Sequence, residues 1–208
     1  MKVCNFAPDM ISVLDIIEDT MVDGPGFRTS IYCAGCRHKC PGCHNPQSWD
    51  FEGGHAMSTD EIMHVIEADP YANVTFSGGD PMYQPEGFAE LARAIKSRTQ
   101  KNIWCYTGFT IEALMANPRQ RALLELIDVL VDGPFVKAKR DESLCFRGSS
   151  NQRILDVPAS LQAGRAVVYE YTPFFVAETG SHEQKERMQS AEYGPMVAKK
   201  VPTPLLFR

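Results

Sequence analysis

The sequence has no excess of positive charge, no long apolar run and no recognisable export signal. Its 208 residues hold 21 Lys+Arg against 26 Asp+Glu, a formal charge of −5. Nucleic-acid binding needs a basic surface that displaces phosphate counterions, so this balance argues against DNA or RNA as a partner. The longest apolar runs are about four residues, whereas a membrane helix needs about 20, so no membrane span or membrane partner is expected. Asp9 and Asp15 stand where a secretory signal has positive and then apolar residues, which predicts a cytoplasmic protein.

Cysteine is the one residue type whose distribution is unusual. A chain of this length buries about 70% of its unfolded surface around one core, so it does not need disulfides for stability. In a reducing compartment, clustered cysteines indicate a metal site. Among the seven cysteines, Cys4, Cys105 and Cys145 are scattered and are expected to be ordinary buried residues. The other four fall close together, at Cys33, Cys36, Cys40 and Cys43.

Three of these cysteines have the spacing C-x3-C-x2-C, at Cys36, Cys40 and Cys43. Three thiolates on one tight loop can hold three irons of a cubane cluster, whose fourth iron is then open to another ligand. If Cys33 also binds, the four thiolates would instead form a closed zinc or iron–sulfur site without catalysis. Cys33 directly continues an apolar strand, so we favour the three-cysteine site and keep the closed site as an alternative. His38, between the cysteines, is expected either to face solvent or to support the loop without binding iron.

Short apolar runs alternate with helical patterns along most of the chain, which is typical of βαβ units. One helix is expected from the capping-box spacing of Ser58 and Glu61, a second after Pro85, and a third region over 111–127 that Asn117-Pro118 interrupts. The pattern predicts an α/β fold with a mostly parallel sheet and right-handed crossovers. The expected strands are Ser12–Ile17, Arg28–Tyr32, Asn73–Phe76, Asn102–Tyr106, Asp128–Val131 and Arg153–Asp156.

Two loops should meet at the carboxyl edge of this sheet. In α/β sheets, ligands bind where the loops that follow parallel strands gather, so the cysteine loop and the Ser77–Pro81 loop should face one cavity. Gly78 and Gly79 lack Cβ atoms and let the backbone approach a ligand closely. Asp80 has the charge to accept a hydrogen bond from an ammonium group. A lone glycine pair would be a plain turn, but its pairing with the cysteine loop favours a binding site.

Together, the cysteine motif and the downstream Gly-Gly-Asp-Pro resemble the radical S-adenosylmethionine (SAM) superfamily. Within that superfamily, the chain resembles the glycyl-radical activases that act on anaerobic ribonucleoside-triphosphate reductase. The cysteine motif alone is typical of the superfamily, while the Val-Asp-Gly and Arg-Gly-Ser-Ser-Asn-Gln segments make the match specific. The resemblance covers residues 10–157, and the segments that carry it are Val22–Arg28, Gly35–Asn45, Phe76–Pro81, Ile103–Gly108, Asp128–Gly133 and Phe146–Gln152.

This resemblance implies an incomplete (β/α) barrel that binds a [4Fe-4S] cluster and SAM. SAM would chelate the open iron, and one electron delivered to the cluster would cleave it to methionine and a 5′-deoxyadenosyl radical. That radical would take hydrogen from a glycine on the large subunit of the reductase, with the electron coming from a donor such as flavodoxin or ferredoxin. No catalytic side chain is implied. The implied cluster ligands are Cys36, Cys40 and Cys43, and the implied SAM contacts are Gly42, Cys43, His44, Gly78, Gly79 and Asp80.

Two other functions remain open from the sequence. One is a different small radical SAM enzyme, either another glycyl-radical activase or an enzyme that modifies a small molecule. The other is a non-catalytic four-cysteine zinc or electron-transfer module, against which the long α/β pattern argues.

The last quarter of the chain departs from the family pattern. We expect residues 1–157 to form the radical SAM domain and residues 158–208 to form a partly ordered extension that is not an independent domain. Within the extension, Ala166–Tyr171 is expected to pair with the sheet edge, and Ser181–Ala191 lacks an apolar stripe. The sequence leaves the roles of four polar residues open. Arg28 would either approach the cluster loop or be a surface charge. Three others suit contacts to the SAM ribose, contacts to a partner or bonding within a turn: Arg147, Asn151 and Gln152.

Overall fold

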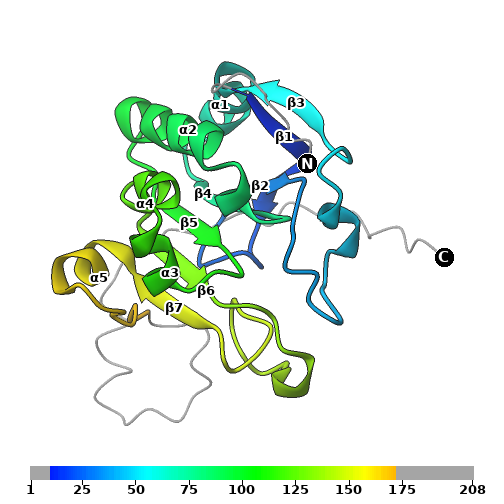
Figure 1. The fold of residues 1–208 in the computed structure, drawn as a ribbon. Coiled ribbons are helices and arrows are strands. Elements are labelled where there is room, and N and C mark those ends of the chain that lie inside the picture. The colour runs from blue at the N-terminus through cyan, green and yellow to red at the C-terminus, as the bar shows by residue number, and fades with distance from the viewer. Residues whose placement is uncertain (1–9, 172–208) are drawn as a thin grey trace, which may run out of the picture. The chain divides into compact units, whose positions relative to one another are not determined.

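A computed structural model describes residues 10–171, which contain a seven-stranded sheet in the order β3-β1-β2-β4-β5-β6-β7 (Figure 1). None of the helices in this part of the chain has the length and apolar character needed to cross a membrane. Cys4 and residues 172–208, including Ser181–Ala191, lie outside the described residues. The strands are β1 (Met10–Thr20), β2 (Arg28–Cys33), β3 (His55–Ser58), β4 (Asn73–Gly78), β5 (Ile103–Tyr106), β6 (Val129–Asp132) and β7 (Arg153–Asp156).

The four central strands are parallel, as the alternating pattern predicts. β2, β4, β5 and β6 pair in parallel, while β1 and β7 are antiparallel to their neighbours. β3 is antiparallel to β1 and therefore runs with the central strands. β1 is antiparallel to β2 because the connection over residues 21–27 is shorter than the dozen or so residues that a crossover needs. β7 is antiparallel to β6 because residues 133–152 contain only the short helix η3 (Lys137–Lys139) and fold back.

Of the five α-helices among the described residues, four begin and end close to the predicted signals, and α5 was not predicted. The capping box is confirmed, since Glu61 N–H donates to Ser58 Oγ at 3.3 Å and Ser58 N–H donates to Glu61 Oε2 at 2.8 Å. The predicted interruption is also confirmed: Asn117 ends one helix and its side chain caps the next. The helices are α1 (Thr59–Ala68), α2 (Pro85–Arg98), α3 (Ile111–Ala116), α4 (Pro118–Leu124) and α5 (Val157–Ala163), with short 3-10 helices η1 (Pro46–Trp49) and η2 (Pro81–Tyr83).

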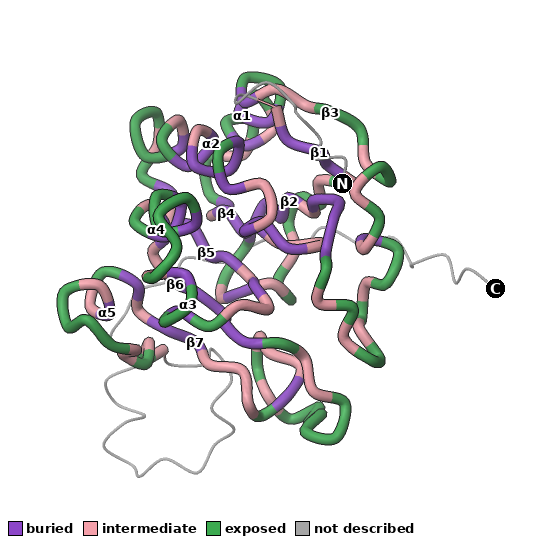
Figure 2. Tube along the Cα trace, in the orientation of Figure 1, coloured by how far each residue is buried: buried purple, intermediate pink, exposed green. Residues whose placement is uncertain are grey.

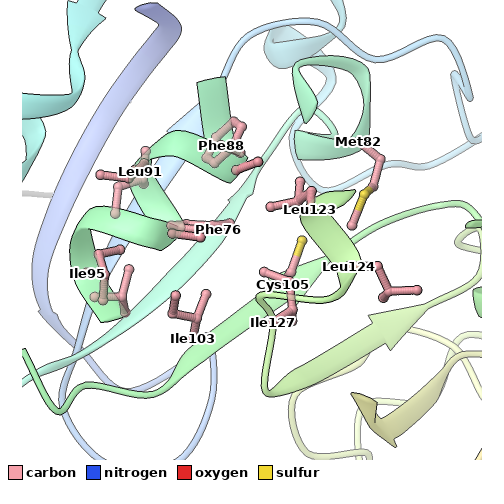
Figure 3. Packing of buried hydrophobic residues seen from close by; sticks show 14 of the residues in the cluster. Phe76, Met82, Phe88, Leu91, Ile95, Ile103, Cys105, Leu123, Leu124 and Ile127 are labelled. Atoms are coloured by element: carbon pink, nitrogen blue, oxygen red, sulfur yellow. The ribbon is translucent and has the colours of Figure 1, made fainter. Parts of the chain in front are cut away.

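Helices cover one face of the sheet and form the main core. α1, α2, α3 and α4 lie side by side along this face (Figure 1). Phe76 on β4 packs against Phe88 on α2 with ring centroids 4.8 Å apart, and Cys105 lies in the same cluster (Figure 3). Each large apolar side chain buried here contributes roughly 1.5–3 kcal/mol. This layer therefore holds the carboxyl ends of the central strands in fixed positions.

The opposite face of the sheet is polar and aromatic. It carries Tyr32, Ser77 and Tyr106, which are neighbours across β2, β4 and β5 and line a cavity. The strands are mostly buried, whereas the loops at their ends are mixed or exposed (Figure 2). Ligand access is therefore from the loops at the carboxyl edge and not through the helical layer.

The described body continues past the predicted end of the radical SAM domain. Asp156 caps α5, and Val157 and Ser160 of that helix are buried. Residues 167–169 then hydrogen-bond to β7, through Asp156 N–H to Val167 O at 3.0 Å and Tyr169 N–H to Ile154 O at 2.9 Å. The pairing with the sheet edge that was expected for Ala166–Tyr171 is thus limited to one isolated antiparallel bridge, between Val168 and Leu155 of β7.

Arg28 lies wholly inside the protein, on the polar face of the sheet. Its guanidinium donates to Thr75 Oγ1 at 2.6 Å and Val74 O at 2.6 Å, and lies 5.4 Å from the Trp104 ring centroid. Burial lowers the pKa of Arg28 to about 10, so it stays charged at neutral pH. It is therefore neither a surface charge nor a neighbour of the cysteine loop, the two roles that the sequence left open for it.

Arg28→Met is expected to destabilise the protein by about 3 kcal/mol or more, because it leaves buried acceptors without a donor. Urea unfolding measures this change. Arg98→Met removes only an exposed ion pair with Asp60 and should cost less than about 1 kcal/mol. Equal effects of the two substitutions would show that the buried hydrogen bonds do not stabilise the fold.

Candidate functional site

Backbone hydrogen bonds tie the roots of the cysteine loop and the glycine loop together. Gly79 N–H donates to Cys33 O at 2.7 Å, and Asp80 N–H donates to Gly35 O at 3.0 Å. Gly78 has φ +97°, and a Cβ there would lie 2.4 Å from the Cys33 backbone nitrogen. A Cβ on Gly79 would lie 2.5 Å from Gly35 O. The two glycines are therefore required for the close approach of one loop to the other.

All three cysteines of the C-x3-C-x2-C spacing line one cavity. Cys36 is buried, while Cys40 and Cys43 are half-buried, and Gly78 and Gly79 line the same space. Cys43 N–H donates to Cys40 O at 3.0 Å, which closes a tight turn through Gly42 at φ +78°. The structure thus brings the two predicted loops to a shared cavity.

Burial raises the pKa of the Cys36 and Cys40 thiols above the usual cysteine value. The backbone N–H groups of His38 and Lys39 oppose this rise at Cys36, and the Phe135 N–H opposes it at Cys40. Asn45 N–H donates to Cys43 Sγ at 3.4 Å, and such donors stabilise the thiolate forms that bind iron.

Cys33 does not join the other three. It is the last residue of β2, is fully buried in the apolar core, and burial raises the pKa of its thiol further than that of Cys36. Within residues 10–171, no group of three or more His, Cys, Asp or Glu side chains is arranged to hold a single metal ion. The burial of Cys33 in the core, away from the cavity, weighs against the closed four-cysteine zinc site.

The remaining scattered cysteines differ from each other. Cys105 is buried in the core, as expected. Cys145 is exposed in the loop between β6 and β7, so the prediction that it is buried is wrong. The sequence around a single cysteine in a polar loop does not show whether its side chain is buried or exposed.

Asp80 lies beneath the cavity and is only 1% exposed. Its carboxylate accepts hydrogen bonds from Met82 N–H and Gly108 N–H, both at 2.9 Å, and from Thr107 Oγ1 at 3.0 Å. His38 Nε2 lies 3.0 Å from Asp80 Oδ2. Asp80 is thus occupied by internal donors, whereas the sequence suggested that it would accept from an ammonium group.

The far wall of the cavity comes from the β6–β7 connection. Phe135 packs against His44 with ring centroids 5.2 Å apart, and Arg147 and Gln152 also line the space. Gln152 Oε1 accepts from Gly148 N–H at 2.9 Å, while Asn151 Nδ2 donates to Pro134 O at 2.8 Å. Of the roles that the sequence left open, Asn151 and Gln152 therefore perform turn bonding.

Sequence reasoning missed several residues around this cavity. Thr107 and Gly108 follow β5, so the edge argument applied to the third parallel strand would have found them. Phe135 and Phe146 lie in an irregular connection and gave no periodic signal. Tyr106 also lines the cavity, and its hydroxyl has no hydrogen-bond partner among the described residues.

The residues present fit an iron–sulfur cluster together with an adenosyl ligand. The donor set is three thiols from one loop, which suits three irons of a cubane and leaves one iron open. The cavity measures about 830 Å³, within the usual range for ligand sites. Gly78 and Gly79 also line this cavity, beside the three cysteines.

Comparisons with known proteins agree with this site. Residues 22–155 match the family model described as a 4Fe-4S single cluster domain. The anaerobic ribonucleoside-triphosphate reductase-activating protein of Vibrio cholerae is 39% identical over 143 residues, covering 64% of this chain and 90% of that protein. The protein of the same name from Escherichia coli K12 is 36% identical over 141 residues, with the same coverage. That of Enterobacteria phage T4 is 32% identical over 139 residues, covering 64% of this chain and 86% of the phage protein.

Proposed function

Because the chain belongs to the family of anaerobic ribonucleoside-triphosphate reductase-activating proteins, we propose that it activates such a reductase by generating a glycyl radical on the large subunit. The observation that carries the proposal is the cavity shared by Cys36, Cys40, Cys43 and the Gly78-Gly79 pair. Another small radical SAM enzyme would share these features. The identity to the named activating proteins favours the reductase as target.

The cysteines Cys36, Cys40 and Cys43 would hold a [4Fe-4S] cluster. When bound, the cluster supplies the electron that splits SAM into methionine and a 5′-deoxyadenosyl radical, which takes a hydrogen atom from the glycine. Cys33 and Cys105 remain in the core, away from this chemistry.

The chain itself binds and orients the substrate. We assign the amino acid end of SAM to the backbone of Gly78 and Gly79, and its neighbouring part to Gly42, Cys43 and His44. Cys43 and His44 line the same space, and Gly42 lies in the turn between Cys40 and Cys43. Asp80 would contribute to SAM binding by holding its loop in place, because its carboxylate already accepts hydrogen bonds from internal donors. The polar sheet face and the loop that carries Phe135 would exclude water from the reacting atoms.

The same proposal includes a barrel-like fold, the bounds of the radical SAM domain and an electron-donor partner. The open seven-stranded sheet with helices on one face is compatible with an incomplete (β/α) barrel. Residues 1–157 would form the radical SAM domain, and the extension from residue 158 would begin with α5 packed on that body. A one-electron donor such as flavodoxin or ferredoxin would reduce the cluster, in the cytoplasm and without nucleic acid or membrane.

Anaerobic reconstitution with iron and sulfide tests this function. The expected result is one oxygen-sensitive [4Fe-4S] cluster per chain, whose reduced EPR signal changes when SAM is added. Under reducing conditions, methionine and 5′-deoxyadenosine should form in equal amounts. A protein that holds its full cluster and yet never cleaves SAM would contradict the proposal, whereas cleavage without activation of the purified reductase would favour a different radical SAM enzyme.

A further inference from the structure

His38 links the tip of the cysteine loop to the glycine loop. Its Nε2 lies 3.0 Å from Asp80 Oδ2, and its side chain is only 19% exposed. A carboxylate can only accept hydrogen bonds, so the imidazole donates from Nε2. The expectation that His38 faces solvent is therefore wrong, and its alternative, support of the cysteine loop, is the one that the contacts favour.

Aromatic rings and backbone fix the position of the imidazole. Phe109 meets it edge-on with ring centroids 4.6 Å apart, and Tyr83 lies at 5.6 Å. On the side of Gly108 there is no room for a methyl group, because a Cβ there would lie 2.5 Å from His38 Cδ2. The ring thus fits a slot formed by the loops that follow β4 and β5.

Asp80 joins the loops that follow three parallel strands. Its carboxylate accepts hydrogen bonds from His38 in the loop after β2, from Met82 N–H in its own loop after β4, and from Gly108 N–H in the loop after β5. Thr107 Oγ1 adds a fourth donor and itself accepts from Phe109 N–H at 3.1 Å. An ionised carboxylate has about four lone-pair sites, which these donors fill. A cofactor amino group would find no free acceptor on it.

We propose that His38 and Asp80 are positioning residues that set the spacing between the cysteine loop and the Gly78-Gly79 backbone, and so set the affinity for SAM. Asp80 lies outside the cavity lining, whereas His38 borders the cavity and bonds to Asp80. The inference rests on the proposed function, in which SAM spans these two loops. The roots of the loops are joined by backbone bonds at Cys33 and Gly35, and His38 joins their outer part. The turn from Cys40 to Cys43 is closed by its own backbone bond, so the cluster should bind without the His38 side chain.

Three variants separate positioning from general stability. His38→Leu keeps the volume and removes the donor, whereas His38→Gln keeps an N–H at a similar reach. Gly108→Ala leaves the Asp80 side chain and its backbone donors in place but pushes the imidazole out of its slot. His64→Leu, on the exposed face of α1, is the matched control for losing a histidine. Each protein is reconstituted anaerobically, assayed for iron and sulfide, and titrated with SAM by calorimetry and by the EPR change of the reduced cluster.

All four variants should carry as much iron and sulfide as the wild-type protein. His38→Leu and Gly108→Ala should bind SAM about tenfold more weakly or worse, as expected for losing or displacing a hydrogen bond to a charged group. His38→Gln should bind within about threefold of wild type, and His64→Leu should be unchanged. Three results would each overturn the inference. The first is wild-type SAM affinity in His38→Leu, and the second is a loss of SAM affinity in His38→Gln equal to that in His38→Leu. The third is loss of the cluster from His38→Leu. A wild-type protein that carries its cluster but does not bind SAM would contradict the proposed function instead.

Discussion

Alanine at Cys36, Cys40 or Cys43 is expected to reduce bound iron and sulfide to background, whereas alanine at Cys33 should leave both at the wild-type level. The three cysteines line the cavity, and losing one thiolate leaves an iron without its protein ligand. Cys33 lies in the core, so its substitution should cost only about 1 kcal/mol of lost apolar burial. Iron and sulfide analysis after anaerobic reconstitution measures the first effect, and urea unfolding of the apoprotein measures the second.

Cys105→Ala is the matched control for Cys33→Ala. Both side chains are fully buried in the same cluster, and neither lines the cavity. Their alanine variants should therefore show similar losses of stability and equal cluster contents. Loss of the cluster from Cys33→Ala, with retention in Cys105→Ala, would restore the closed four-cysteine site.

Gly78→Ala is expected to have the second large effect, on both stability and SAM binding. The residue has φ +97°, and its new Cβ would lie 2.4 Å from the Cys33 backbone nitrogen, which cannot move without opening the pairing of β2 with β4. The combined strain and overlap should cost roughly 3 kcal/mol or more. Urea unfolding of the apoprotein and calorimetric SAM titration of the reconstituted variant report the two effects.

Gly164→Ala separates the overlap from the backbone strain. Gly164 also has a positive φ, at +64°, but a Cβ there meets nothing within 4 Å. Its substitution should cost about 1–2 kcal/mol and leave SAM binding unchanged. If Gly78→Ala were no more damaging than Gly164→Ala, the close contact between the two loops would not be what holds the site together.

Sequence reasoning located the central part of the fold because its signals are local. The capping box at Ser58 and the break at Asn117-Pro118 depend on a few neighbouring residues and are confirmed. β3 was missed because His55–Ser58 is short and has no buried residue that would mark it. The direction of β7 depends on the path of residues 133–152, which no periodic pattern describes.

The site was predictable where it depends on strand order. Parallel strands bring the cysteine loop and the glycine loop to one edge, and the structure places them there. The use of Asp80 was not predictable, because its partners His38 and Gly108 come from two other loops. A charge in a motif suggests a ligand contact, and only the geometry shows that internal donors already occupy it.

Transfer of hydrogen from the reductase to SAM's adenosyl group is the most direct test of the account. A reductase large subunit whose glycines carry deuterium at Cα would be incubated with the reconstituted protein, SAM and a one-electron reductant, and the 5′-deoxyadenosine analysed by mass spectrometry. The account predicts one deuterium per 5′-deoxyadenosine formed in activation, together with an organic radical signal on the reductase. Unlabelled 5′-deoxyadenosine and no radical on the reductase, despite a full cluster and SAM cleavage, would contradict it.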